Sequence, residues 1–208
     1  MQRLPVLLPT ALRWEVWVKM LNQRVMLTRR LLKEALLRLL ESEPLDKISV
    51  TQLCQEAGVN RATFYRHYTT QEDVLQEIQQ DTLNSIQSLL SRFDVWGRIS
   101  PWDQAFLICK YLWEHPREAR LFLGNSDIGS DFSEKLFQCV KGRRLFECYF
   151  EPSMDAAHRE LVTAFWQNGF LSLLRKWLVD GVPLKPEAVA ELILQIAQCG
   201  LDAEKHSS

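Results

Sequence analysis

The spacing of the apolar residues restricts this chain to helical folds. From about Leu27 onward, apolar residues recur three and four positions apart, and the first run comprises Leu27, Leu31, Leu32, Ala35, Leu36, Leu39 and Leu40. This spacing places the apolar side chains on one face of an amphipathic helix. No stretch shows the alternation of apolar and polar residues that is typical of a half-buried strand. The sequence therefore predicts an all-α protein.

Turn-forming residues divide the pattern into successive helices. We expect the first helix to end near Pro44, and the next three to span Val50 to about Glu56, Arg61 to about Tyr68, and Thr70 to about Phe93. Further helices are expected at about 101–114, 116–123, 130–150, 155–180 and 186–200. Pro116 and Pro186 suit first turns, whereas Gly124, Gly129, Pro152 and Gly181 to Pro183 are expected to mark breaks.

The two short helices form a candidate helix-turn-helix between Val50 and Tyr68. Ser49 and Gln52 have the spacing of a capping box, and Asn60 can cap the second helix. Gly58 suits the turn because a residue without a Cβ adopts positive φ at little cost. We expect Leu53, Cys54, Ala57, Val59, Phe64 and Tyr68 to face the core.

The second short helix has the features of a DNA recognition helix. Its exposed side and ends would carry Arg61, Ala62, Thr63, Tyr65 and His67, and its first turn would offer free N–H groups to phosphate. Short or donor-bearing side chains allow a helix to enter the major groove and read base edges. From spacing alone, an interior helical hairpin remains an alternative.

The segment from Thr28 to Tyr68 resembles the DNA-binding domain of the TetR family of bacterial regulators. The run Ala57-Gly-Val-Asn-Arg-Ala-Thr-Phe-Tyr-Arg-His-Tyr68 carries most of the resemblance, which extends over about residues 27–80. The resemblance implies an N-terminal three-helix bundle with a helix-turn-helix, followed by a larger helical domain for dimerisation and ligand binding. It implies contacts at or near DNA for Thr51, Gln52, Asn60, Arg61, Ala62, Thr63, Tyr65 and His67. We add Arg29, Lys47 and Arg66 as further candidates for DNA binding.

One residue departs from the family pattern. TetR-like sequences often have a lysine that opens the fourth helix and binds phosphate, and Gln71 stands at that position here. This predicts a weaker electrostatic contact with DNA. Lys47, Arg29 or Arg30 could compensate for it, and the alternative for each is a solvated charge on the surface.

We expect three segments along the chain: residues 1–26, a helix-turn-helix domain at 27–73, and a helical regulatory domain at 74–204. Leu4 to Leu21 is rich in apolar residues, but charged residues interrupt it, so neither a membrane span nor a signal peptide is expected. Residues 1–26 are interpreted either as a short helix that packs on the body or as residues upstream of the natural start, because Met20 and Met26 precede the first well-patterned helix. We assign them no function.

The charges are distributed unevenly along the chain, which suits a negatively charged partner at the N-terminal part only. The whole chain has a net charge of −1; residues 1–75 carry 11 basic and 8 acidic side chains, whereas the remainder carries 14 and 18. The first part is therefore at +3 and the second at −4, which suits a protein that faces phosphate with its N-terminal part.

The C-terminal part is expected to form the homodimer. One recognition helix covers few base pairs, whereas a dimer places two such helices about 34–36 Å apart on a palindromic operator. The segments Phe165 to Gly181 and Pro186 to Leu192 also resemble a TetR subgroup common in Firmicutes. The expected interface residues, any of which could instead belong to the intrachain core, are Phe165, Gly169, Phe170, Leu173, Val189, Leu192, Ile193 and Ile196.

Aromatic residues in the same part predict a pocket for a flat or lipophilic small-molecule effector. An aromatic stripe at helical spacing more often belongs to the core, which is the alternative for each candidate. The candidates are Trp102, Phe106, Cys109, Trp113, Phe122, Phe137, Tyr149 and Trp166. An effector would act by favouring a conformation whose recognition helices no longer fit the operator.

Other classes of protein find less support. The four histidines are isolated, and neither a metal-ligand spacing nor a nucleophile or phosphate-binding motif is present, so we expect no enzyme, metal or cofactor. Five scattered cysteines without a C-x-x-C pair indicate a reducing, cytoplasmic location. The alternative function is a protein-binding adaptor on the same scaffold, with weak or lost DNA binding.

Overall fold

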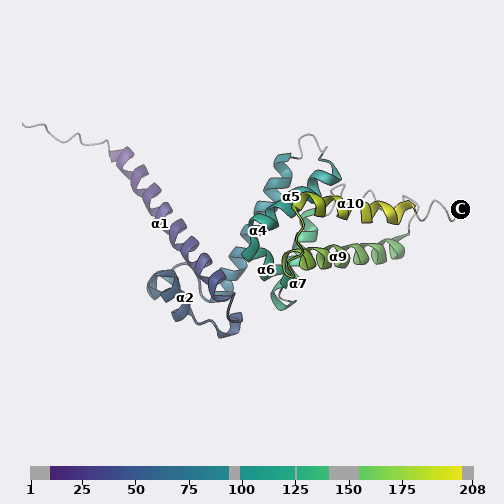
Figure 1. The fold of residues 1–208 in the computed structure, drawn as a ribbon. Helices are drawn as coiled ribbons and strands as arrows, with labels where there is room; N and C mark the ends of the chain where they lie inside the picture. Colours follow the sequence, from purple (N-terminus) through teal and green to yellow (C-terminus); the bar gives the residue numbers. More distant parts are fainter. Residues whose placement is uncertain (1–9, 94–98, 125, 141–154, 203–208) are drawn as a thin grey trace, which may run out of the picture. The chain divides into compact units, whose positions relative to one another are not determined.

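The computed structural model describes residues 10–93, 99–124, 126–140 and 155–202, which form helices joined by turns and contain no strand (Figure 1). This agrees with the predicted all-α class. The elements of the N-terminal part are α1 (Thr10–Leu39), the short 3-10 helix η1 (Leu45–Lys47), α2 (Val50–Ala57), α3 (Arg61–Phe64) and α4 (Gln71–Phe93). Those that follow are α5 (Pro101–Glu114), α6 (Pro116–Gly124), α7 (Ser126–Val140), α9 (Ala156–Leu178) and α10 (Pro186–Asp202).

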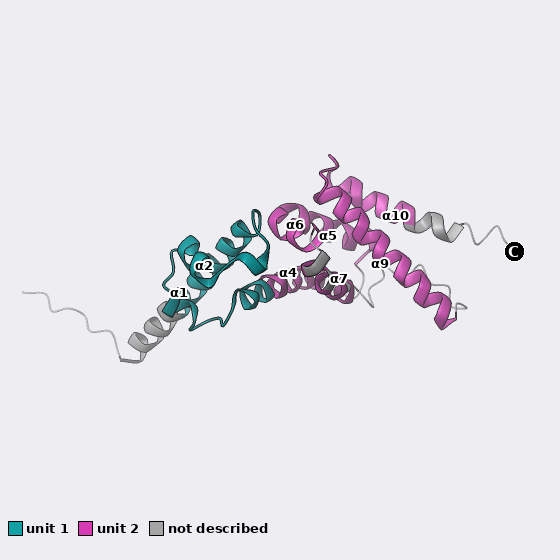
Figure 2. Cartoon of the chain, turned by 90° about the horizontal axis from the view of Figure 1, so that it is seen from below, with its two compact units in different colours: residues 1–77 teal, residues 78–208 magenta. Residues whose placement is uncertain are grey.

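The chain divides into two compact units, residues 1–77 and 78–208 (Figure 2). The boundary lies within α4, so the first two turns of this helix belong to unit 1 and its remainder to unit 2.

Unit 1 is built on α1, α2 and α3. Its core contains Leu32, Leu36, Leu53 and Phe64, whose side chains are fully buried. The helices α1 and α2 pack against each other, and an ion pair of 2.6 Å between Arg38 Nε and Glu56 Oε1 joins them.

The helix α1 is longer at its N-terminus than the apolar pattern indicated. It begins at Thr10, so residues 10–26 continue directly into the predicted first helix and form no separate short helix. The segment from Thr10 to Leu39 contains neither glycine nor proline, and a helix propagates readily when nothing interrupts it.

The helix α3 is shorter than expected. It ends at Phe64, and the chain continues through a turn in which the Tyr68 N–H donates to the Phe64 carbonyl at 3.0 Å. This turn keeps Tyr68 close to Phe64, with the ring centroids 5.7 Å apart.

In unit 2, α5 packs against α10, and α6 packs against both α7 and α9. Gly129 was expected to break a helix, but it lies inside α7. A Cβ at this position would overlap the carbonyl oxygen of Phe122 in α6, so the glycine permits a close approach of two segments and does not end a helix. The predicted helix beyond Val140 and the break at Pro152 lie outside the described residues.

Candidate nucleic-acid interface

The first helix of the motif begins and faces the core as the sequence predicted. The Ser49 side chain caps α2 by accepting a hydrogen bond of 3.1 Å from the Gln52 N–H. Leu53, Cys54 and Ala57, which share one face of α2, are buried. Burial raises the pKa of the Cys54 thiol, and the nearby Arg61 partly opposes this shift.

The turn between α2 and α3 is a Schellman motif centred on Gly58. Gly58 has φ 64°, its N–H donates to the Gln55 carbonyl, and the Val59 N–H donates to the Cys54 carbonyl at 2.9 Å. The positive φ explains the glycine, because a side chain here would strain the backbone. Two carbonyl groups at the end of α2 are thereby satisfied, and the direction of the chain into α3 is fixed.

The recognition helix α3 is capped at its start and buried along one side. The Asn60 Oδ1 accepts a hydrogen bond of 2.8 Å from the Ala62 N–H. Phe64 and Tyr68 are 0% and 6% exposed, as expected of anchors at i and i+4. The Tyr65 and Phe64 rings pack edge to face, with the centroids 5.4 Å apart.

The opposite side of α3 and its following turn is open to solvent. Arg61, Ala62, Tyr65 and Arg66 are exposed, whereas Thr63 and His67 are half-buried. The Arg61 guanidinium lies 6.0 Å from the Tyr65 ring centroid, close enough for a cation–π contact. One short face therefore presents cationic, aromatic and small side chains together.

Several other residues predicted to lie near DNA already have partners within unit 1. The Gln52 side chain donates to Glu43 at 2.5 Å, and Arg66 donates to the Thr63 hydroxyl at 3.1 Å. Arg29 forms an ion pair of 3.0 Å with Glu77. Lys47 and Thr51 are exposed near the start of α2.

The start of α4 is capped by Asp73. Its Oδ2 accepts hydrogen bonds from the Thr70 and Thr69 N–H groups at 2.9 and 2.7 Å, which lower the pKa of this carboxyl. The Gln71 side chain donates to Glu72 at 3.2 Å. The position where TetR-like sequences often carry a cation thus presents a neutral amide.

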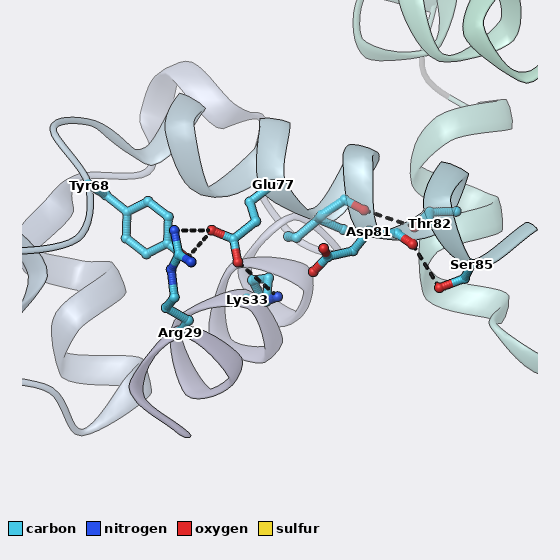
Figure 3. Close-up of polar contacts among 8 residues, drawn as sticks. Arg29, Lys33, Tyr68, Glu77, Asp81, Thr82 and Ser85 are labelled. Carbon is cyan, nitrogen blue, oxygen red and sulfur yellow. Dashed lines mark hydrogen bonds and ion pairs between the residues drawn. The ribbon is translucent and has the colours of Figure 1, made fainter. Parts of the chain in front are cut away.

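A second carboxylate, that of Glu77 on α4, joins three segments of unit 1 (Figure 3). It accepts from Lys33 Nζ at 3.1 Å, pairs with Arg29 at 3.0 Å, and accepts from the Tyr68 hydroxyl at 2.8 Å. Burial, followed by the hydrogen bond to Glu77, raises the pKa of Tyr68 well above its usual range. Glu77 was not among the predicted site residues, because its partner Lys33 lies 44 residues away along the chain.

Most of the aromatic residues that were predicted to line a pocket lie in ring pairs or are partly buried. Trp102 stacks on Phe106 with a centroid distance of 5.0 Å, whereas Cys109 is buried. Trp113 stacks on Trp177, and Phe122 stacks on Phe132 at 4.5 Å. Trp177 and Phe132 were absent from the predicted set. Phe137 and Trp166 are half-buried, and Tyr149 lies outside the described residues.

The residues predicted for a dimer interface divide into two groups. Phe170, Val189 and Ile193 are buried within the chain, and Leu173 is half-buried. Phe165, Gly169, Leu192 and Ile196 are exposed; the Phe165 side chain is exposed to 70%. Leu161, which is one turn before Phe165 on α9 and was not predicted, is 72% exposed. Its i, i+4 relation to Phe165 is the signal that could have identified it.

The helices α2 and α3, the turn at Gly58 between them and the exposed side of α3 form a helix-turn-helix, the arrangement found in a class of DNA-binding proteins. Residues 32–78 match the model described as "Bacterial regulatory proteins, tetR family". No curated protein matches the chain at a significant level.

Solved structures with the same fold extend the likeness to most of the chain. A TetR transcriptional regulator from Streptococcus agalactiae is 18% identical, has a TM-score of 0.66, and aligns over 86% of this chain and 98% of its own. The dihydroxyacetone kinase operon activator DhaS is 16% identical, with a TM-score of 0.60 and coverage of 85% and 97%. SmeT, the repressor of a Stenotrophomonas maltophilia multidrug efflux pump, is 14% identical, with a TM-score of 0.56 and coverage of 82% and 88%. At these identities the comparisons establish a TetR-like fold.

Two further observations concern the described residues only. None of their helices combines the length and the apolar character needed to cross a membrane. Among the same residues, no group of three or more histidine, cysteine or acidic side chains could hold a metal ion.

Proposed function

We propose that this protein is a homodimeric transcriptional repressor that binds a palindromic operator through α3 and is released by a small-molecule effector. The observation that carries the proposal is the construction of α3. Its entry is fixed by Gly58 and Asn60, its inner side is anchored by Phe64 and Tyr68, and Arg61 and Tyr65 are left exposed. Such a short, rigidly held helix can enter the major groove.

Within α3 and the turn that follows it, we propose a division of roles between phosphate and base contacts. Arg61 and Arg66 carry the charge that phosphate attracts, whereas Ala62, Thr63 and Tyr65 are suited to base edges and the thymine methyl group. His67, Asn60, Thr51, Gln52, Lys47 and Arg29 complete the proposed contacts. The hydrogen bond of Gln52 to Glu43 must open, or be shared, before its amide can reach DNA.

We further propose that α9 and α10 form the dimer interface through their exposed apolar residues. Leu161 and Phe165 form one pair on α9, and Leu192 and Ile196 form another on α10. Exposed apolar side chains in such groups mark interaction surfaces. The aromatic residues of unit 2 supply the apolar lining that we propose for an effector site.

Whether the protein represses or activates transcription is a separate part of the proposal, and we propose repression. A dimer that occupies promoter DNA prevents other proteins from binding there, and SmeT, named as a repressor, has the same fold. DhaS, named as an operon activator, has it too. A reporter fused to the regulated promoter should therefore be expressed more strongly when the gene for this protein is deleted. Weaker expression of the reporter would show that the protein is an activator.

Footprinting of the DNA upstream of the gene tests the DNA-binding function. We expect a protected palindrome, and affinity should fall steeply as salt rises because phosphate binding releases counterions. The double variant Arg61→Ala, Tyr65→Ala should lose at least tenfold in affinity, about 1.4 kcal/mol. Arg120→Ala, which removes an exposed arginine of α6, is the control and should bind as the parent does.

The alternative function is a protein-binding adaptor with weak or lost DNA binding. The neutral Gln71 and the internal partners of Gln52 and Arg29 favour it, because each removes a ready contact with DNA. An adaptor would give no protected palindrome. Parental affinity in the Arg61→Ala, Tyr65→Ala variant would show that the groove assignment is wrong.

A further inference from the structure

The Glu77 carboxylate is the meeting point of α1, α4 and the segment that follows α3. Its two oxygens have donors on both sides: Lys33 Nζ lies 3.1 Å from Oε1, while Arg29 Nη2 and the Tyr68 hydroxyl lie 3.0 and 2.8 Å from Oε2. Figure 3 shows the three side chains converging on this carboxylate. Its side chain is 20% exposed, so solvent screens these contacts less than those of a fully exposed pair.

The contact with Tyr68 links this carboxylate to the recognition helix. The Tyr68 ring is buried, lies 5.7 Å from the Phe64 ring, and is covered by the Arg29 guanidinium at 5.6 Å. Phe64 is the last residue of α3 and is fully buried. A change in the position of the Tyr68 hydroxyl would therefore be passed through two packed rings to α3.

Arg29 and Lys33 both lie on α1, four residues apart, and both interact with the same acceptor. Without the carboxylate, these two cations of α1 would lose the acceptor on α4 that they share, and with it an attraction between the two helices. Glu77 thus neutralises one charge and holds the C-terminal part of α1 against the start of α4.

We propose that Glu77 is a positioning residue for DNA recognition. It fixes the register of α1, the Phe64–Tyr68 turn and α4, so that the exposed face of α3 is presented in one orientation. The inference rests on the proposed DNA-binding function and adds to it a residue that itself contacts no DNA.

The direction of the change in DNA affinity distinguishes a positioning role of Glu77 from a purely electrostatic one. Replacing Glu77 with glutamine removes one negative charge from this part of unit 1, so electrostatic attraction to phosphate alone would tighten DNA binding. Loss of positioning acts in the opposite direction, because a recognition helix with several orientations spends only part of its time in the competent one.

The experiment compares Glu77→Gln with Glu34→Gln on a fluorescein-labelled duplex that the parent protein selects from a random-sequence pool. Glu34 pairs with Arg30 on the same helix at 3.1 Å, so its variant makes the same charge change without loosening contacts between helices. We expect about tenfold weaker binding for Glu77→Gln, or about 1.4 kcal/mol. Glu34→Gln should bind as tightly as the parent or slightly more tightly. Parental or tighter binding by a folded Glu77→Gln variant would overturn the proposal.

Circular dichroism and thermal melting establish whether each variant is folded. If Glu77→Gln does not fold, the Tyr68→Phe variant tests the proposal in its place. This change removes only the hydroxyl that reaches Glu77, and we expect about threefold weaker binding with the melting curve little changed. If both variants fold, the double variant should bind no more weakly than Glu77→Gln, because both changes break one network. Parental affinity of Tyr68→Phe, or full additivity, would contradict the inference. Failure of the parent to select any duplex would instead overturn the proposed function itself.

Discussion

Gly129 shows how a single residue depends on packing that is distant in sequence. Gly129 lies inside α7, where a glycine destabilises the helix by about 0.5–1 kcal/mol relative to alanine. The loss is tolerated because a Cβ would overlap the Phe122 carbonyl oxygen. This oxygen belongs to the backbone of α6, which cannot move aside as a flexible side chain would.

Gly129→Ala should therefore destabilise the protein by about 1–3 kcal/mol, as other overpacked sites do. The free energy of unfolding in urea measures this loss. Gly124→Ala is the matched control, since its Cβ would meet the Val179 Cγ1 at 3.5 Å, an ordinary contact. Equal stabilities of the two variants would contradict the assigned role of Gly129.

At the scale of the element, α4 depends on the cap that Asp73 provides. An acidic residue in the first turn also interacts favourably with the helix dipole. The two N–H groups bonded to its carboxylate hold the pKa below the ordinary value of 3.8, so folding favours the charged form. The resulting stabilisation is present above that ordinary value and is lost as the pH falls through the lowered pKa.

Asp73→Asn should lower the thermal stability at neutral pH and reduce the loss of stability on acidification below about pH 4. Melting curves recorded between neutral and acidic pH measure both effects. Asp46→Asn, which changes an exposed carboxylate on η1, should keep the acid dependence of the parent. An unchanged acid dependence in Asp73→Asn would show that the cap has no part in it.

At the scale of the whole molecule, the exposed side chains of α9 and α10 bear on assembly. Phe165 is 70% exposed, and its ring contacts that of Trp166 edge-on at 5.8 Å. A large aromatic residue in this setting is the usual anchor of a protein–protein interface. The buried Phe170, Val189 and Ile193 are occupied within the chain and would contribute to a dimer only indirectly.

Phe165→Glu should weaken the proposed dimer by about 2 kcal/mol or more, because it places a charge in an apolar contact. Sedimentation should then show monomers at concentrations where the parent is dimeric, and DNA affinity should fall with it. Phe93→Glu is the matched control, since this phenylalanine of α4 is 57% exposed and lies outside α9 and α10. A dimeric Phe165→Glu variant would place the interface elsewhere.

Most of the recognition motif could be predicted from the sequence because its determinants act over short distances. The cap at Ser49, the positive φ at Gly58, the cap at Asn60 and the pairing of Phe64 with Tyr68 each involve residues within a few positions of one another. Backbone hydrogen bonds and i, i+4 contacts of this kind are encoded locally. The same reasoning overestimated the length of α3, since the tight turn after Phe64 has no strong sequence signal.

Tertiary structure decided the features in which distant segments meet. Glu77 lies 44 residues from Lys33, and neither spacing nor composition relates the two positions. Trp177 and Phe132 are ring partners only because α5, α6, α7 and α9 bring them to Trp113 and Phe122. An amphipathic pattern identifies the apolar face of α9 or α10, but only packing against the rest of the chain determines which of those side chains are covered and which remain for a partner. The sequence by itself therefore determined the helices and the local frame of α3, whereas the network that supports α3 and the free apolar surface depend on which helices lie against each other.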